Sequence, residues 1–287
     1  MNRIEIPCNP ANPVNYLACC GLFDLLARFD PETVGWWRTE APVAFILESE
    51  ITEADLLAML IRTLSDPAKW KFIYHHEGVE PIRMDVSFAL PNQDSSLVVP
   101  LDWWYETSEL DGSIAQKSAW KMYAGQQTVE KITTDMIAEI ARLKVTPGRL
   151  EDLLNISMAM TGRFGFDPRA SRNALDVGYS SNDLLLPVLT FAFTELLAVF
   201  GLSSFFPARA GQSNKFSSSR GWYDASKEEE SGSGFIYSLW NEKLPLLLAR
   251  RAAHADATAP STALFAPRAM RKNYSNLTLA QTIQPTT

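Results

Sequence analysis

The sequence lacks the short glycine-based motifs that identify most nucleotide-binding and hydrolytic enzymes. No glycine is followed by lysine, which excludes a Walker-type phosphate loop. Neither the three-glycine fingerprint of dinucleotide-binding folds nor the Gly-x-Ser-x-Gly nucleophile elbow occurs. None of the ten lysines has an acidic residue two positions before it, as nucleases built from carboxylates and a lysine require. The sequence therefore predicts a protein that is not an enzyme and that needs no cofactor.

Cysteine is also scarce, with only Cys8, Cys19 and Cys20 in the chain. An odd number, with two of the three adjacent, does not suit a disulfide framework. Cys19 and Cys20 fall on an apolar helical stripe, which is typical of small buried hydrophobes, whereas a nucleophilic thiol needs a base beside it. Reduced thiols are typical of the cytoplasm, and the N-terminus shows no signal-peptide pattern. We therefore expect a cytoplasmic protein.

Histidine occurs three times, and two of the three are neighbours in the stretch "YHHE" at 74–77. His75, His76 and Glu77 could offer a metal ion two imidazoles and a carboxylate. Neighbouring residues of a strand point to opposite faces, however, so both imidazoles rarely reach one ion. We do not expect a metal site here.

One apolar run, "LLLPVLTFAFTELLAVFGL" at 184–202, is long enough to raise the question of a membrane. Pro187 lies near its start and Glu195 in its interior, and a carboxylate is costly to place inside a bilayer. The run is better interpreted as a buried core helix near 187–201, and no membrane partner is expected.

Charge is unevenly distributed along the chain, whose formal net charge is −7. Residues 1–100 have 7 lysines and arginines against 14 acidic residues, and residues 101–200 have 9 against 13. Residues 201–287 reverse the balance, with 10 against 6. The chain is therefore not a uniformly basic nucleic-acid binder, and a polyanionic partner would more plausibly meet its second half.

Hydrophobic periodicity and turn signals predict an α+β fold with irregularly interleaved strands and helices and with mixed or antiparallel sheets. A helix begins at the cap Asn12-Pro13. Gly21 inside this helix indicates close packing against another element. The other expected helices are 52–64, 126–143 and 149–160, and the expected strands are 3–7, two within 34–49, 70–74, 82–90, 96–105 and one that opens 235–253.

The same signals divide the chain into three parts. Residues 1–110 are expected to form an N-terminal α+β part. Residues 111–254 are expected to form a helical and α+β part that contains the candidate binding loops. Residues 207–234 within it are dense in serine and glycine, which indicates a long loop or an extended hairpin. Residues 255–287, rich in alanine, threonine and proline, are expected to be a loosely held tail.

Two stretches combine cations with aromatic and amide side chains. In "AQKSAWKMYAGQQ" at 115–127, the helix start that follows would attract phosphate through its backbone N–H groups. Glutamine binds adenine edges or phosphate oxygens. A solvated helix start with an anchoring tryptophan is an equally good interpretation. The candidate residues for nucleic-acid binding are Lys117, Trp120, Lys121, Gln126 and Gln127.

The second stretch is "TGRFGFDPRASRNALDVGYSSND" at 161–183. Arginine guanidinium groups bind phosphates bidentately, and glycine allows a backbone to approach a ligand closely. A third group of cations, at 209–220, adjoins aromatic residues, which suits a surface that follows a backbone and stacks bases. The candidates are Arg163, Arg169, Arg172 and Asn173 in the second stretch and Arg209, Lys215 and Arg220 in the third.

Three aspartates leave an alternative open for the second stretch. Asp167 precedes proline, which is common in turns, and Asp176 and Asp183 could pair with Arg163 or Arg172. Aspartates of this kind form structural ion pairs more often than they act in catalysis. The arginines therefore serve either a polyanion or the aspartates of their own chain.

Four blocks of the sequence resemble a known family. They are "NPANPVNYLACCGLFDLLAR" at 9–28, "DWW" and "KMYAGQQ" within 102–127, "RFGFDPRASRNALDVGYSSND" at 163–183 and "YSLWNEKLPLLLARRAA" at 237–253. Together they are similar to the Csb/Csx-type subunit of type I-U (also called I-G) CRISPR-Cas effector complexes, a reduced counterpart of the Cascade large subunit. The first and third blocks are the specific ones.

The resemblance implies a non-enzymatic ribonucleoprotein subunit that acts in antiviral defence. Its partners would be other CRISPR effector subunits, crRNA and target DNA, and it would help PAM recognition and strand opening. In such complexes base pairing with the guide RNA recognises the sequence, while protein recognises only a short flanking duplex. The chain departs from the pattern in being short for a large subunit and in its net charge of −7.

Two other functions remain open at this point. The chain could be a purely protein-binding scaffold of the same complex, with the arginines held against a partner's acidic surface. It could also be an uncharacterised metal-dependent nuclease or a thiol-dependent enzyme, against which the missing motifs argue.

Overall fold

The fold is described from a computed structural model. It covers residues 1–74, 81–104, 106–107, 114–115, 120–122, 127–144, 146–169, 188–206, 221–223, 233–254, 261–271 and 274–283. Helices and strands alternate irregularly in this part of the chain, and every strand pair in it is antiparallel. The expected α+β class with interleaved elements is confirmed.

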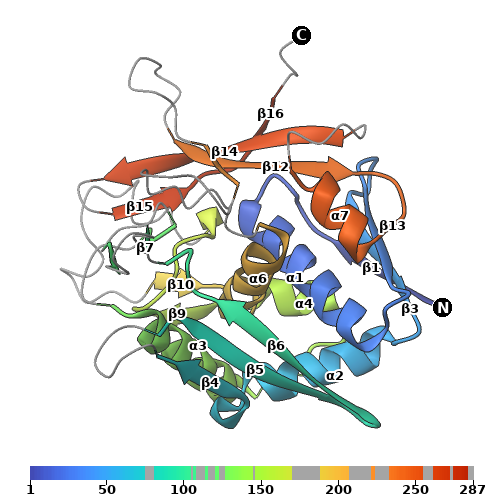
Figure 1. Cartoon of the computed structure of the whole chain (residues 1–287), viewed down its shortest axis with the longest axis horizontal. Coiled ribbons are helices and arrows are strands. Elements are labelled where there is room, and N and C mark those ends of the chain that lie inside the picture. Colours follow the sequence, from blue (N-terminus) through green and yellow to red (C-terminus); the bar gives the residue numbers. More distant parts are fainter. Residues whose placement is uncertain are drawn as a thin grey trace.

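The elements follow in chain order (Figure 1). The helices are α1 Pro13–Phe29, α2 Glu53–Leu64, the 3-10 turn η1 Pro67–Lys69, α3 Val129–Leu143, α4 Leu150–Asn155, α6 Ala192–Phe205 and α7 Leu246–Ala252. The strands are β1 Asn2–Pro7, β2 Val34–Arg38, β3 Ala44–Ser49, β4 Trp70–Ile73, β5 Arg83–Leu90, β6 Gln93–Pro100, β7 Glu106–Thr107, β8 Ile114–Ala115, β9 Met158–Met160, β10 Val188–Thr190, β11 Trp222–Tyr223, β12 Gly234–Trp240, β13 Leu244–Pro245, β14 Ser261–Arg271, β15 Tyr274–Leu277 and β16 Gln281–Thr282.

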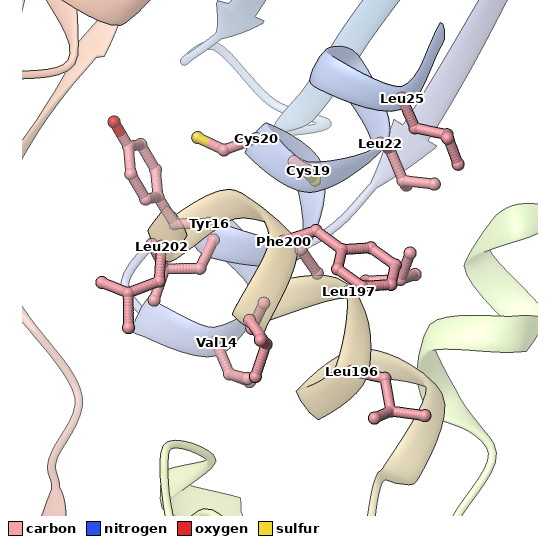
Figure 2. Close-up of a cluster of buried hydrophobic side chains, with 14 of the residues drawn as sticks. Val14, Tyr16, Cys19, Cys20, Leu22, Leu25, Leu196, Leu197, Phe200 and Leu202 are labelled. Carbon is pink, nitrogen blue, oxygen red and sulfur yellow. The ribbon is translucent and has the colours of Figure 1, made fainter. Parts of the chain in front are cut away.

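Two buried helices, α1 and α6, cross at the centre of the molecule (Figure 1). The side chain of Asn12 caps α1 by accepting a hydrogen bond from the backbone N–H of Val14, as the Asn-Pro signal predicts. Figure 2 shows leucine, valine and aromatic side chains of both helices filling the space around the crossing. The expected buried apolar helix is therefore confirmed as α6, but it spans Ala192–Phe205 and not 187–201, and Val188–Thr190 form the strand β10.

Glycines allow this crossing to be close. A Cβ atom placed on Gly201 of α6 would lie 1.9 Å from the carbonyl oxygen of Leu17, and one on Gly21 of α1 would lie 2.2 Å from that of Leu197. No side chain fits at either position without moving a backbone. The close packing that Gly21 indicates is thus made with α6.

Three antiparallel sheets surround the helix pair (Figure 1). One has the strand order β1-β3-β2-β13, the second β4-β5-β6, and the third β11-β12-β14-β15 with β16 paired to β14. Tyr16 of α1 links the first and third sheets, because its ring stacks on Trp37 and contacts Tyr237, and its hydroxyl donates to the carbonyl of Ser238 at 3.0 Å. Buried residues on both sides of residue 110 share one hydrophobic core, so the expected boundary there does not separate two cores.

The C-terminal segment differs from its prediction. Within the expected loose tail, β14 pairs with β12 from Ser261 to Pro267, and β15 and β16 pair with β14. Leu264 and Ala266 of β14 are buried, as is Leu277 of β15. The prediction of a loosely held tail is therefore wrong for 261–271 and 274–283, because alternate small and apolar side chains face the core there.

One predicted helix is shorter in the structure than in the prediction. The expected helix 149–160 ends at Asn155, because Met158–Met160 instead form β9 and pair with β10. No helix in the described part of the chain is long and apolar enough to cross a membrane.

Candidate functional site

The loop 161–169, called here the arginine loop, follows β9 and is fixed by aromatic packing. The rings of Phe164 and Phe166 stack on each other at 5.6 Å, and both contact the ring of Trp103 at 5.6 Å. Trp120 contacts Phe166 from another side at 5.5 Å. All four residues are fully buried. The backbone of the loop is therefore held rigidly where its charged side chains begin.

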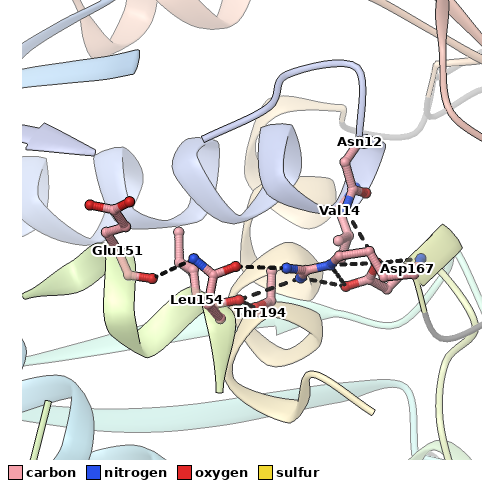
Figure 3. A network of polar contacts seen from close by, with 8 residues as sticks. Asn12, Val14, Glu151, Leu154, Asp167 and Thr194 are labelled. Atoms are coloured by element: carbon pink, nitrogen blue, oxygen red, sulfur yellow. Dashed lines mark hydrogen bonds and ion pairs between the residues drawn. The ribbon is translucent and has the colours of Figure 1, made fainter. Parts of the chain in front are cut away.

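Asp167 is the polar centre of this loop and is fully buried. Its carboxylate accepts hydrogen bonds from Arg169 at Nε (3.0 Å), at Nη2 (2.6 Å) and at the backbone N–H (2.9 Å). It also accepts one from Nδ2 of Asn12 at 3.2 Å. Figure 3 shows this network joining the start of α1, the end of α4 and the arginine loop. Asp167 thus ties three segments that are distant in sequence.

Arg169 is committed to the same network. Besides its bidentate pair with Asp167, it donates from Nη1 to Oδ1 of Asn155 at 3.0 Å. Its guanidinium lies 3.6 Å from the centre of the Phe191 ring, where cation–π attraction adds to the ion pair. The side chain is 27% exposed. Of the two partners that the sequence left open for the arginines, a polyanion or an aspartate of the same chain, Arg169 therefore has the aspartate.

Glu195 of α6 is a second buried carboxylate beside the loop. Its Oε2 accepts a hydrogen bond from the backbone N–H of Phe164 at 2.7 Å, while its Oε1 is buried without a hydrogen-bond partner in the described part of the chain. Burial raises the pKa of Glu195 to about 7, and the charge of Asp167 adds to the rise. The Phe164 N–H and the charge of Arg163 act in the opposite direction.

Arg163 completes the set of charged groups around Glu195, and Gln127 lies near the loop at Gly162. Arg163 is 8% exposed, and its positive charge favours the ionised form of Glu195. Oε1 of Gln127 is buried, and a Cβ on Gly162 would lie 3.5 Å from it and 3.7 Å from Oδ2 of Asp135 in α3. These are ordinary van der Waals distances, so the loop lies against the start of α3 without requiring a glycine at this position. The charged groups together form a buried ionic cluster, defined here as Arg163, Asp167, Arg169 and Glu195.

The structure brings two of the sequence-predicted residues, Arg163 and Arg169, together in this cluster, and Gln127 lies near the loop at Gly162. Trp120 packs in the core against the rings of Trp222 and Phe235. Lys121 is partly exposed, and its Nζ lies 5.0 Å from the centre of the Trp104 ring. The remaining candidates lie outside the described residues: Lys117, Gln126, Arg172, Asn173, Arg209, Lys215 and Arg220.

Sequence reasoning missed the roles of Glu195 and Asn12 in this cluster. Glu195 is the single charged residue of the apolar run 184–202, and an isolated carboxylate there is a signal for a buried polar partner. The sequence could not show that this partner is the backbone of the arginine loop. Asn12 was recognised as a helix cap, and its amide nitrogen has the second task of binding Asp167.

The cysteines that could act in an enzyme lie among the described residues, whereas the candidate metal ligands of the "YHHE" stretch do not. Cys19 and Cys20 are fully buried, and burial raises the pKa of both thiols, which favours the unreactive protonated form. Sγ of Cys8 lies 3.6 Å from Sγ of Cys19. Among the described residues no group of three or more His, Cys, Asp and Glu could hold a metal ion. His75, His76 and Glu77 lie outside those residues.

No family model, no curated protein and no solved structure matches the chain.

Replacing Glu195 by glutamine is expected to flatten the pH dependence of stability between about pH 4.5 and 7. The folded state binds a proton that the unfolded state has released in this range, so ionisation of Glu195 lowers the free energy of unfolding as the pH rises through it. A pKa rise of this size corresponds to about 3 kcal/mol at most. Urea unfolding at pH 5 and pH 8 measures the change. A variant that keeps the slope of the native chain would contradict the assignment.

Proposed function

We propose that this chain is a non-enzymatic subunit of a type I CRISPR RNA-guided DNA surveillance complex. It contacts crRNA or target DNA beside neighbouring subunits and contributes to PAM recognition and strand opening. The observation that carries the proposal is spatial. The described parts of the four sequence blocks that resemble the type I-U subunit, far apart in the chain, pack into one hydrophobic core.

Contacts between the blocks are direct. Asn12 of the first block donates to Asp167 of the third, and the Tyr16 hydroxyl of the first donates to the Ser238 carbonyl of the fourth. Trp103 of the second block packs on Phe164 of the third. Residue types that specify one fold are expected to meet in its core and at its polar centre, so this convergence supports a shared architecture behind the resemblance.

The buried ionic cluster provides a fixed support for the candidate binding segment. Arg169, anchored through Asp167, is followed directly by 170–187, which contain Arg172 and Asn173. A rigid anchor immediately before a binding segment reduces the conformational entropy that binding must overcome. Because Arg169 is already paired, the cations proposed to meet phosphate are Lys121, Arg172 and those of 209–220.

A scaffold role is the second candidate, and a specific observation favours it. Both described arginines of the arginine loop interact within the protein: Arg163 is only 8% exposed, and Arg169 is bound to Asp167. If the cations at 117–126, 172 and 209–220 also fail to reach nucleic acid, the subunit braces its neighbours without touching RNA or DNA.

The proposal is tested first by co-purification. The tagged chain is expressed with its genomic neighbours, and we expect it to elute with other proteins and with a short RNA of uniform length. Elution of the chain alone and free of RNA, with its neighbours present, would contradict the proposed function. The same preparation provides the complex for binding assays.

Changing Lys121 and Gln126 together to alanine is expected to weaken target-DNA binding while the complex still assembles. If Lys121 contacts only phosphate, its loss also lowers the slope of log affinity against log salt by about one unit. Gel-shift titrations at several salt concentrations measure both. Lys71→Ala, an exposed lysine on β4 outside the four blocks, is the matched control. Unchanged affinity of the double variant would leave the scaffold role as the better account.

A further inference from the structure

The apolar run Leu244–Leu248 reaches the surface and is called here the apolar ridge; Leu244 and Leu246 pack partly against the hydrophobic core, while Leu247 and Leu248 are exposed. Leu247 is 76% exposed and Leu248 is 54% exposed, and none of the five is buried. Single exposed apolar residues are normal on soluble proteins, but two adjacent leucines this exposed, within an apolar run, indicate a contact surface. The ridge is formed by β13 and the first turn of α7, at the outer edge of the first sheet (Figure 1).

The exposure is a consequence of the fold. Leu244 and Pro245 pair with Gly35 and Val34 of β2, which fixes the chain before the helix begins. Ala249 and Ala252, three positions apart on α7, are buried and form its inner face. Leu247 and Leu248 are consequently held on the outer face, and no rearrangement of α7 alone would bury them.

The last turn of α7, which follows the ridge in the chain, is positively charged. Asp24 of α1 is 1% exposed and receives two guanidinium groups, one from Nε of Arg28 at 3.1 Å and one from Nη2 of Arg250. One carboxylate between two arginines leaves a net positive charge. Nε of Arg250 is buried without an acceptor in the described part of the chain, and Arg251 is exposed beside it.

The opposite end of the ridge has no excess of positive charge, because the exposed Glu242 adjoins Lys243. Nζ of Lys243 binds both carboxylate oxygens of Glu48, at 2.7 and 2.9 Å, and lies over the ring of Trp36. The surface therefore combines an apolar centre with a positive charge at one end only. Charge complementarity indicates an acidic border on whatever covers it, on the side that meets Arg250 and Arg251.

We propose that the apolar ridge is a docking surface for a neighbouring protein subunit, which covers Leu247 and Leu248 with an apolar groove bordered by carboxylates near Arg251. The inference rests on the proposed function, because it takes the occupant to be another subunit of the same complex. Exposed leucines at the centre and a cation at the border match the usual arrangement of protein interfaces, where an apolar core is surrounded by a polar rim.

The test compares the double variant Leu247→Ser/Leu248→Ser with the native chain in co-purification with the genomic neighbours. Leu189→Ser, a leucine of β10 that is 50% exposed, is the matched control. We expect the double variant to lose at least tenfold of one partner protein, the control to lose none, and all three chains to unfold at the same temperature when isolated. Arg251→Glu is expected to weaken the same partner's retention less, with a stronger effect at low salt.

The outcomes separate this inference from the proposed function. If the native chain retains its partners and RNA and the double variant retains all of them equally, the docking surface is wrong while the proposed function stands. If the native chain elutes alone, both are wrong. If the native chain instead forms dimers, or binds vesicles of phosphatidylserine, and the double variant does neither, the ridge has a different occupant and the inference is overturned.

Discussion

Replacing Gly201 by valine is expected to prevent stable folding or to lower the free energy of unfolding by about 3 kcal/mol or more. A Cβ at this position would lie 1.9 Å from the carbonyl oxygen of Leu17 and 2.9 Å from the backbone nitrogen of Gly21. Both are backbone atoms of α1 and cannot rotate away, so the two central helices would have to separate. A total stability of about 5–15 kcal/mol leaves little margin for this.

Urea unfolding followed by tryptophan fluorescence measures the effect, and soluble yield reports variants that do not fold. Gly148→Ala is the matched control, because nothing lies within 4 Å of a Cβ at that position, and its stability is expected to change by less than about 0.5 kcal/mol. Gly201→Ala is expected to fall between the two. A valine variant with native stability would mean that α1 and α6 do not cross as closely as described.

The sequence predicted this crossing in part. The Asn12-Pro13 cap, the apolar stripe of α1 and the apolar run containing α6 are local features, and each is found where it was expected. Gly21 in a helix interior indicated a close neighbour. Which helix that neighbour is depends on packing between residues nearly two hundred positions apart, and no local pattern specifies such a pairing.

Long-range pairing also explains the elements that were predicted wrongly. The periodic run at 149–160 favours a helix, but Met158–Met160 gain strand partners in Val188–Thr190, and tertiary pairing overrides local propensity. The C-terminal strands were missed because β14 finds its partner in β12, which is separated from it in the chain by β13 and α7. Composition alone made these residues resemble a tail.

The candidate site was predicted at the level of residue types. Three arginines among glycines and aspartates indicated a charged loop with two alternative partners, a polyanion or the aspartates of the chain. For Arg169 the partner is Asp167, two residues away, so this choice could be weighed from the sequence. The contribution of Asn12 and of Glu195 depends on how α1 and α6 are placed, which only the fold provides.

Replacing Asp167 by alanine is expected to lower the free energy of unfolding by about 3–5 kcal/mol. The change removes the acceptor of three hydrogen bonds from Arg169 and of one from Asn12, and it leaves a partly buried guanidinium without its carboxylate. Uncompensated buried charge is costly, whereas loss of an exposed ion pair is not. Glu139→Ala, which breaks an exposed pair with Arg142, is the matched control and is expected to cost less than about 1 kcal/mol.

A double-mutant cycle with Arg169→Met separates the pair from the rest of the cluster. If Asp167 and Arg169 act as a structural unit, the double variant is expected to be less destabilised than the two single changes added together, since each single change leaves one partner uncompensated. Urea unfolding of the four chains gives the coupling energy. If Arg169→Met instead leaves stability unchanged and lowers the affinity of the assembled complex for DNA, then Arg169 leaves Asp167 to bind phosphate, and the cluster is part of the nucleic-acid interface itself.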